Sequence, residues 1–386
     1  MERDRAQRRV QLRRRRQIAL AALVGLALGA FALGAALGDG KAPEDGTEGG
    51  TEPKPAAELP LSQLAGQRIV TSLESTGVSK KLKAAIGRGE VAGVVLFAGS
   101  FPSRAAGQRL IARLQAIRRP PLLREPLLIM VDQEGGLVKR VEGPPDASAA
   151  EMGERGAAFS GEQGRLTARS LRQLGVNVDL APVLDVARSG GTIAETERGF
   201  GATAAKVTAT AIPFAEALQA GGVAATGKHF PGLGSASENT DEAVQRIGLS
   251  KLKLREVDEA PYRAFVAAGG DLVMLGTAIY PAFSPLPAAF ARPIATGELR
   301  GRLGFEGVAV TDALETVAVG AFGGPAKAGV AAARAGADLL LYTHLNAAED
   351  ARRALVKKLR AGKLDRGEFE ESVQRVLDLR AKLGRP

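Results

Sequence analysis

Carboxylate side chains stand directly after two short apolar runs of this chain, where they could do chemistry. The run "LLIMVD" ends at Asp132 and the run "GVAVTD" ends at Asp312. An ionised carboxylate at the end of a buried strand is expected to have a functional role. Asp132, Gln133 and Glu134 together offer acceptors for several hydroxyl groups, and Asp312 with an acid nearby suits a retaining-glycosidase nucleophile. The alternative interpretation is that each acid caps the helix after its strand.

Two adjacent donors, Lys228 and His229, end the apolar stretch "VAATGKH". Neighbouring strand residues point to opposite faces, so both reach one pocket only if the chain bends there. The Phe-Pro-Gly that follows favours such a bend. Arg198, in the loop "ETERGFGATA", can clamp a polar group through two parallel hydrogen bonds, although a plain surface arginine fits the same pattern.

Short apolar runs alternate with helical segments from residue 91 to residue 342. Strands that are apolar throughout are buried on both faces, as in parallel sheets, and their alternation with helices predicts an α/β fold. Barrels of this class build their sites from the ends of several strands, whereas a doubly wound sheet concentrates its site at one point. We therefore predict a TIM-like (β/α)8 barrel. The polar residues at predicted strand ends are Asp132, Asp185, Lys228 with His229, Thr277 and Asp312.

The composition limits the chemistry and the partners. The 386 residues contain no Cys, which excludes disulfides, thiolate metal sites and a Cys nucleophile. The net charge is +10, but eight Arg and two acids fall within the first 17 residues, so the rest of the chain is close to balanced. We therefore expect no nucleic-acid partner.

The N-terminal residues carry signals of membrane targeting. Residues 1–17 form a basic cytoplasmic segment, and residues 18–38 contain no charged side chain. At about 1.5 Å per residue, a helix of this length spans the roughly 30 Å core of a bilayer. The arginines predict that the rest of the chain lies outside the cytoplasm, as a single-pass membrane protein. A cleaved signal peptide is the competing interpretation, and the protein would then be secreted.

The remainder of the chain divides into a linker and one domain. Residues 39–58 are rich in Gly, Pro, Glu and Lys, which predicts a disordered linker. Residues 59–386 are predicted to form a single catalytic domain, of a size that suits a barrel with insertions.

Eight motifs follow one another between about residue 60 and residue 383: "GVVLF", "VDQEGG", "VNVDLAPVLDV", "ERGFG", "GKHFPG", "GFEGVAVTDAL", "AGADLLL" and "SVQRVLDLRAKLG". With these motifs in this order, the chain resembles the family 3 glycoside hydrolases, particularly the bacterial β-N-acetylglucosaminidase (β-hexosaminidase) branch. The resemblance implies a TIM-like barrel without the second sandwich domain of the larger β-glucosidases. It implies neither a metal nor an organic cofactor.

The resemblance also implies roles for single residues. Asp312 stands where the family has its nucleophile, which forms a covalent glycosyl-enzyme. Asp132 corresponds to the acid that binds substrate hydroxyls. The remaining sugar-binding positions are occupied by Arg140, Arg198, Lys228 and His229.

The loop "KHFPGLGSASENTD", residues 228–241, departs from this branch at the acid/base. The branch has an Asp-x-His dyad there, in which the protonated His donates to the leaving oxygen. Here Asn239 and Asp241 occupy the two dyad positions. We predict that Asp241 itself acts as acid/base, its proton held by burial or by the charge of Asp312. The reserve candidates are Glu238 and Glu242.

Three further positions depart from the branch. Leu233 replaces an earlier His of the same loop, Leu137 replaces the Arg of the family's "VDQEGGRV", and Thr277 stands where the family often has a His. The second histidine of the chain, His344, follows the last predicted strand, and the sequence assigns no role to it.

The sequence therefore predicts a retaining glycoside hydrolase that releases terminal β-linked N-acetylglucosamine, or glucose, from cell-wall or other glycans through a glycosyl-Asp312 intermediate. A glycan, with peptidoglycan fragments as one source, is the expected partner. Loss of general acid catalysis costs about 10²–10⁴-fold in rate. There are thus two alternative interpretations. The protein is an enzyme with slow turnover, or it is a membrane-tethered glycan-binding protein that does not hydrolyse its ligand.

Overall fold

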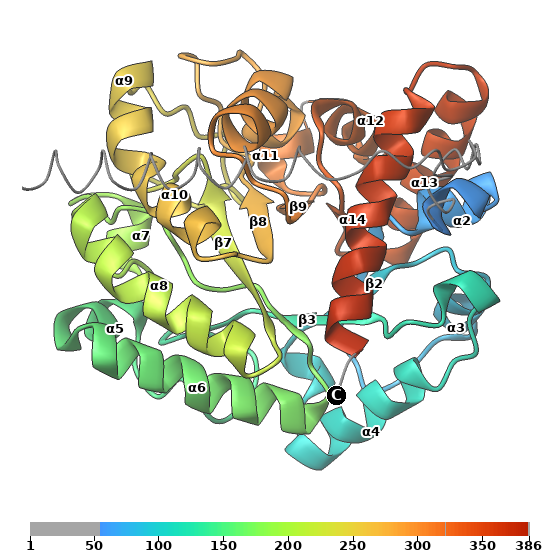
Figure 1. Ribbon diagram of the computed structural model, residues 1–386, viewed down its shortest axis with the longest axis horizontal. Helices are drawn as coiled ribbons and strands as arrows, with labels where there is room; N and C mark the ends of the chain where they lie inside the picture. Colours follow the sequence, from blue (N-terminus) through green and yellow to red (C-terminus); the bar gives the residue numbers. More distant parts are fainter. Residues whose placement is uncertain (1–54, 321, 385–386) are drawn as a thin grey trace, which may run out of the picture. The chain divides into compact units, whose positions relative to one another are not determined.

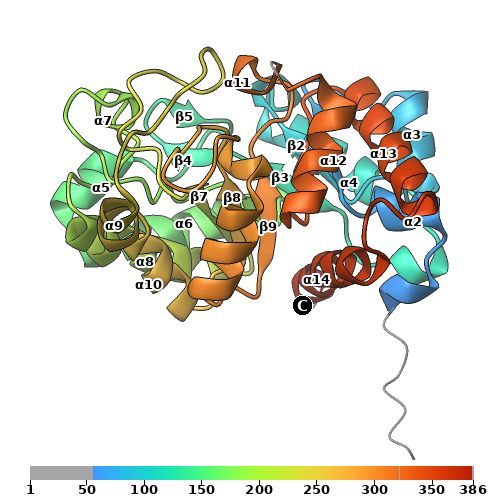
Figure 2. The same cartoon turned by 90° about the horizontal axis from the view of Figure 1, so that it is seen from above.

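A computed structural model describes residues 55–320 and 322–384 (Figure 1, Figure 2). Within these residues, eight parallel strands follow one another around a barrel in the order of the sequence. The predicted TIM-like α/β barrel is therefore confirmed. The strands are β1 (Ile69–Leu73), β2 (Gly93–Leu96), β3 (Leu128–Val131), β6 (Val178–Asp179), β7 (Ala224–Phe230), β8 (Leu272–Leu275), β9 (Val308–Thr311) and β10 (Leu340–Leu341).

The last strand closes the barrel on both sides. β10 pairs in parallel with β1, where Ile69 lies opposite Leu340. On its other side, a bridge joins Val310 of β9 to Leu339, and the Thr311 amide donates to the Leu339 carbonyl over 2.9 Å. Closure gives every strand two neighbours, so the sheet presents no unpaired edge at this seam.

Alternation of side chains divides the apolar core into two layers. On β2, Val94 packs with the outer layer and Val95 with the inner layer, and Ile129 and Met130 do the same on β3. Neighbouring strand residues point to opposite faces, so a strand that is buried on both faces must be apolar throughout. This explains the continuous apolar runs of the sequence.

Helices cover the outside of the barrel, as the view in Figure 2 shows. The α-helices are α2 (Leu61–Gly66), α3 (Lys80–Gly87), α4 (Arg104–Gln115), α5 (Ala149–Arg155), α6 (Ala157–Leu174), α7 (Thr192–Glu195), α8 (Ala204–Ala220), α9 (Lys251–Lys253), α10 (Ala260–Ala267), α11 (Val317–Gly320), α12 (Pro325–Ala335), α13 (Leu345–Arg360) and α14 (Arg366–Gly384). The 3₁₀ segments are η1 (Pro55–Glu58), η2 (Ala98–Ser100), η3 (Pro121–Leu123) and η5 (Ala288–Phe290). The π-helical segments are η4 (Leu254–Asp258) and η6 (Pro293–Arg302).

Hydroxyl side chains fix the start of several of these helices. The side chains of Ser79, Ser103 and Thr203 each accept a hydrogen bond from the backbone amide three residues further on. Ser148 and Glu151 form a reciprocal capping box at the start of α5. Each cap of this kind stabilises a helix by about 1 kcal/mol.

A small hairpin between β3 and α5 shapes the rim of the barrel. It consists of β4 (Gln133–Gly135) and β5 (Val138–Lys139). The buried Gln133 side chain holds it, because its amide nitrogen donates to the carbonyls of Val141 and Pro144, each over 2.9 Å. Gly135 has φ +94°, and a Cβ there would lie 2.2 Å from a backbone oxygen, so only glycine fits this turn. The hairpin carries Glu134 and leads into Arg140.

The C-terminal helix α14 closes the amino-terminal end of the barrel. Its Val376, Leu379 and Leu383 are buried in one cluster with the inward-facing residues of the strands. Residues from the first positions of strands, such as Leu128 and Leu272, belong to this cluster. The helix thus keeps water out of the inner core at the end that is opposite to the strand C-termini.

The folded part begins four residues earlier than predicted. η1 starts at Pro55, Ala56 is 1% exposed, and the Ala56 amide donates to the Gln374 side chain of α14 over 3.3 Å. The linker prediction for 39–58 is therefore wrong for residues 55–58, because α14 provides a surface on which they pack.

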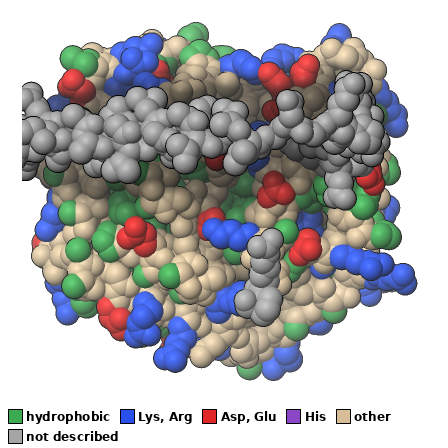
Figure 3. All heavy atoms as spheres, in the orientation of Figure 1, with side chains coloured by type: hydrophobic (Ala, Val, Ile, Leu, Met, Phe, Trp, Pro, Cys, Tyr) green, Lys and Arg blue, Asp and Glu red, His purple; other side chains and the backbone are tan. Residues whose placement is uncertain are grey.

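The predicted basic segment 1–17, the apolar span 18–38 and the rest of the linker lie outside the described residues. In the part that the structure describes, no helix combines the length and the apolar character needed to cross a membrane. On the described surface seen in Figure 3, basic and acidic side chains are interspersed, as the near balance of charge beyond residue 17 predicts.

We expect Leu379→Ala to lower the free energy of unfolding by about 2–5 kcal/mol, because it removes buried methyl groups and leaves a cavity at the barrel end. Urea unfolding followed by circular dichroism measures the change. Glu371→Ala, at an exposed position of the same helix, should stay within about 0.5 kcal/mol of wild type. Equal unfolding midpoints for the two variants would contradict this packing.

Candidate active site

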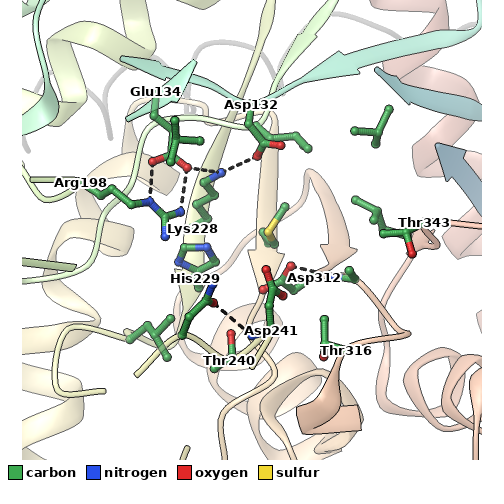
Figure 4. A pocket seen from close by; sticks show the side chains of 18 of the residues that line it. Asp132, Glu134, Arg198, Lys228, His229, Thr240, Asp241, Asp312, Thr316 and Thr343 are labelled. Carbon is green, nitrogen blue, oxygen red and sulfur yellow. Dashed lines mark hydrogen bonds and ion pairs between the residues drawn. The ribbon is translucent and has the colours of Figure 1, made fainter. Parts of the chain in front are cut away.

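A cavity of about 300 Å³ opens at the carboxyl ends of the strands (Figure 4). The inward-facing Leu180, Met274 and Leu341 line it together with charged side chains from the strand ends. All seven predicted site residues line this one cavity, although they come from distant parts of the sequence. They are Asp132, Arg140, Arg198, Lys228, His229, Asp241 and Asp312.

Four charged side chains form one network at one end of the cavity (Figure 4). Lys228 Nζ lies 2.8 Å from Asp132 Oδ1 and 2.6 Å from Glu134 Oε1. Arg198 binds Glu134 with two parallel hydrogen bonds, each of 2.8 Å. The predicted clamp of Arg198 on a polar substrate group stays a prediction, and in this structure its guanidinium binds Glu134.

This network fixes the charges of its members. Burial alone would raise the pKa of Glu134, but the charges of Lys228 and Arg198 outweigh it and lower that pKa to about 2. Burial opposes the charge of Lys228 as well, yet Asp132 and then Glu134 raise the pKa of Lys228 above its usual range. Glu134 and Lys228 are therefore an ionised pair at neutral pH, with side chains only 2% exposed.

Arg140 approaches the same network from the end of the hairpin. Its Nη2 lies 3.7 Å from Asp132 Oδ2, and its guanidinium lies 5.5 Å from the centre of the Phe97 ring. The Nε atom of Arg140 is buried and has no hydrogen-bond partner among the described residues. An unpaired buried donor of this kind is uncommon in proteins and often marks a functional site.

His229 is held by a carboxylate that sequence reasoning did not assign to the site. Its Nδ1 donates to Asp185 Oδ2 over 2.8 Å, and the backbone amides of His229 and Leu233 donate to the same carboxylate. The side chains of Lys228 and His229 both line the cavity. The position of Asp185 at a predicted strand end was the sequence signal that could have placed it in the site.

A second buried acid, Asp179, lies at the end of β6. It accepts the Gln133 amide over 3.0 Å and so holds the start of the hairpin. Burial raises the pKa of Asp179 well above its ordinary value. No role for Asp179 was predictable from the sequence, because a single acid within an apolar strand does not reveal which segment it will contact.

The two predicted catalytic carboxyl groups meet at the middle of the cavity (Figure 4). Asp312 follows β9, and its Oδ1 accepts the Ala313 amide over 2.7 Å. Asp241 lies in the loop after β7, where its carbonyl accepts the Val317 amide over 3.3 Å. Desolvation by the cavity wall raises the pKa of Asp241, and the charge of Asp312 raises it further, while His229 and Arg198 oppose this rise.

Other predicted positions lie away from the cavity. Glu238, a reserve acid, is exposed and its carboxylate contacts Gln245 over 3.4 Å, and Glu242 is exposed. Thr277 is buried and its hydroxyl has no partner among the described residues. Leu137 is 77% exposed, although the adjacent Val138 lines the cavity.

Glu315 and Thr343 line the cavity without having been predicted. Glu315 follows the nucleophile position by three residues, and it contacts both Thr343 and His344 at the end of β10. Among the described residues, no cluster of three or more His, Asp or Glu side chains is arranged to hold a metal ion.

Comparison with known proteins identifies one family. The family model "Glycosyl hydrolase family 3 N terminal domain" matches residues 61–379. The chain is 37% identical over 339 residues to an "Uncharacterized secreted glycosyl hydrolase" of Arthroderma benhamiae, which covers 85% of this chain and 96% of that protein. It is 38% identical over 272 residues to a "Beta-hexosaminidase" of Xylella fastidiosa, which covers 68% of this chain and 78% of that protein.

Two solved structures share the fold. A glycoside hydrolase family 3 β-N-acetylglucosaminidase from a Paenibacillus strain has a TM-score of 0.80 at 33% identity, over 84% of this chain. The comparison covers 63% of that enzyme, so this chain spans somewhat less than two thirds of its length. A β-N-acetylhexosaminidase from Beutenbergia cavernae has a TM-score of 0.78 at 31% identity, over 84% of this chain and 99% of that chain.

The barrel, its charged cavity at the strand ends and these matches define a protein of the glycoside hydrolase class. The chain belongs to glycosyl hydrolase family 3, in the branch of the bacterial β-hexosaminidases.

The lowered pKa of Glu134 makes the stability of the fold depend on pH. A carboxyl whose pKa falls from 4.5 to about 2 on folding stabilises the protein above pH 4.5, and this contribution disappears as the pH falls towards 2. At about 1.4 kcal/mol per unit, the contribution at neutral pH is on the order of 3 kcal/mol. We expect Glu134→Gln to be less stable than wild type at pH 6, with the difference shrinking between pH 4.5 and 2.

Urea unfolding at pH 6, 4 and 3 measures this difference. Glu238→Gln is the matched control, since Glu238 is exposed and lies outside the network. A difference between Glu134→Gln and wild type that stays constant over this range would mean that the network does not hold the Glu134 charge.

Proposed function

We propose that this protein is a retaining glycoside hydrolase that releases terminal β-linked N-acetylglucosamine from glycans. The observation that carries the proposal is the pair of carboxyl groups, Asp312 and Asp241, beside a preformed network of charged donors and acceptors in one cavity. A volume of about 300 Å³ suits a single sugar ring, which favours removal of the terminal residue. The activities named for the matched hexosaminidases support the choice of N-acetylglucosamine over glucose.

The network is suited to sugar hydroxyl groups. The carboxylates of Asp132 and Glu134 accept hydrogen bonds, and Lys228, Arg198 and Arg140 donate them. Because these side chains already hold one another through ion pairs of 2.6–3.7 Å, their positions cost little to organise when a sugar binds. In our proposal they bind the hydroxyls of the terminal sugar and set its anomeric carbon beside Asp312.

Hydrolysis then proceeds in two displacements. A carboxylate oxygen of Asp312 attacks the anomeric carbon, the bond to the leaving oxygen breaks, and Asp241 gives that oxygen its proton. A water molecule then attacks the same carbon and gives a proton to Asp241, and Asp312 leaves as a carboxylate. The sum is one glycoside and one water converted into a free sugar and an alcohol, with both acids restored.

The electrostatics of the two acids suit these two steps. While Asp312 is a carboxylate, its charge helps Asp241 to retain the proton that the first step needs. In the glycosyl-enzyme, Asp312 is a neutral ester and this charge is gone, so Asp241 becomes a stronger acid and exists as the base that the second step needs. One carboxyl group can thereby replace the Asp-x-His dyad of the branch.

We also propose that the barrel acts outside the cytoplasm, with residues 18–38 as a membrane anchor. The apolar span and its flanking arginines support this, and the related Arthroderma protein is described as secreted. Cell fractionation with mass spectrometry of the mature N-terminus distinguishes a retained anchor from a cleaved signal.

We expect Asp312→Asn to reduce hydrolysis of aryl N-acetyl-β-glucosaminides by the full-length chain to background, because no nucleophile remains. Asp241→Asn should lower turnover of N,N′-diacetylchitobiose by about 10²–10⁴-fold, since its sugar leaving group needs a proton. The same variant should keep much of its glycosylation rate on 2,4-dinitrophenyl glycosides, whose leaving group needs little protonation. Steady-state rates on both substrates measure this contrast.

Glu242→Gln, in the same loop but outside the cavity lining, is the control and should behave as wild type. A wild type that is no faster than Asp312→Asn on every N-acetylglucosaminide and glucoside would contradict the proposal. Sugar binding without turnover would favour the glycan-binding alternative.

The raised pKa of Asp241 predicts the direction of the pH dependence. Because only the protonated acid donates, kcat/KM for the chitobiose should fall as the pH rises through the pKa of Asp241, which lies above the ordinary value of 3.8. In Asp241→Asn this alkaline decline should disappear. If the variant keeps the decline at the same pH, another group supplies the proton.

A further inference from the structure

Both histidines of the chain stand at the rim of the barrel, and each has its Nδ1 bonded to a carboxylate. His229 is bonded to Asp185 over 2.8 Å, and His344 is bonded to Glu315 over 3.0 Å. His229 is nearly buried, whereas the His344 side chain is 77% exposed. The catalytic roles proposed above use neither the second histidine nor its carboxylate.

Glu315 uses its acceptor atoms to organise the end of β10. Its Oε2 accepts the Thr343 amide, the Thr343 hydroxyl over 2.9 Å and the His344 amide over 3.1 Å. Its Oε1 faces the His344 ring. The carboxylate therefore fixes both the backbone and the imidazole of His344, which is otherwise an exposed side chain with free rotation.

This group lies at the leaving-group side of the site, with His344 directly after the lining residue Thr343 and just outside the cavity wall. Glu315, Thr316 and Thr343 line the cavity, and Figure 4 shows Thr316 and Thr343 across Asp312 from Arg198. A terminal sugar whose hydroxyls are bound by the Glu134–Arg198 network, with its anomeric carbon at Asp312, directs its glycosidic bond towards this side.

We propose that His344, positioned by Glu315, binds a hydroxyl group of the second sugar of the substrate. This inference rests on the proposed hydrolase function and specifies the leaving group as a sugar. An ionised carboxylate only accepts, so Nδ1 carries the proton, and Nε2 has no partner among the described residues. A sugar hydroxyl can both donate and accept, so it satisfies Nε2 in either protonation state of the ring.

The structural alternative is that Glu315 merely caps the start of α13. That role would make the Glu315 contacts important for stability, but it would not distinguish one substrate from another. The test must therefore compare substrates that differ only in the second sugar. Methyl N-acetyl-β-glucosaminide and N,N′-diacetylchitobiose are a suitable pair of substrates. Both have alcohol leaving groups that need a proton, and only in the chitobiose is the leaving group a sugar.

We expect His344→Ala in the full-length chain to lower kcat/KM for the chitobiose by about 2- to 12-fold, the value of one hydrogen bond, mainly through KM. Its kcat/KM for the methyl glycoside should not change. Glu315→Gln should reproduce part of the loss on the chitobiose. The control is Asn346→Ala, two residues further along at an exposed position of α13, whose side chain contacts Lys81 and not Glu315.

An equal loss on both substrates would overturn the proposal, because it would assign His344 to the leaving oxygen or to the fold. No loss on the chitobiose would also overturn it. The Asp312→Asn background gives a readout that does not depend on turnover: by calorimetry, it should bind the chitobiose more tightly than N-acetylglucosamine, and His344→Ala should remove this gain. A wild type that hydrolyses neither glycoside contradicts the proposed function, whereas the binding measurement still decides the role of His344.

Discussion

The buried ion pairs between Glu134, Lys228 and Arg198 are the interaction on which the rest of the site depends. An unpaired charge at a side chain only 2% exposed would cost several kcal/mol, so each member requires the others in place. The network joins the hairpin after β3, the loop before α8 and the end of β7. It therefore fixes the shape of that end of the cavity before any ligand arrives.

The two ends of the site are built differently. At the end that holds the Glu134–Arg198 network, buried carboxylates anchor the lining residues. Asp185 accepts the amides of His229 and Leu233 and the His229 ring, and Asp179 accepts the Gln133 amide. Asp241 at the middle of the cavity and His344 beyond it are exposed, and the outside contacts that hold them are a bond from the Val317 amide to the Asp241 carbonyl and the bonds of His344 to Glu315. Under the proposed function, this difference in burial gives rigid binding of the terminal sugar and a more open side for the leaving group.

The barrel and the cavity residues were predictable from the sequence because the geometry of parallel strands determines where strand ends lie. That geometry does not determine the contacts between loops. Parallel strands bring their carboxyl ends to one rim, so Asp132, Lys228 and Asp312 had to meet once the alternation was recognised. Pairings across that rim were not predictable, because they depend on loops whose paths no periodicity encodes. The sequence indicated Glu134 only as an acceptor for hydroxyl groups. It assigned no role to His344, because its contact with Glu315 appears only in the folded structure. The start of the domain was misplaced for the same reason, since residues 55–58 are ordered by a helix more than 300 positions away.

The position of α14 has a consequence for the order of assembly. The helix that seals the inner core is the last one in the described chain, so the ribosome releases it after every strand has been made. Until then, the inner apolar layer faces water at the amino-terminal end of the barrel. A partly synthesised chain therefore exposes a hydrophobic surface that aggregates easily. The exposed interval runs from the completion of β10 to the docking of α14, and the final helical turns decide when the inner core becomes closed to water.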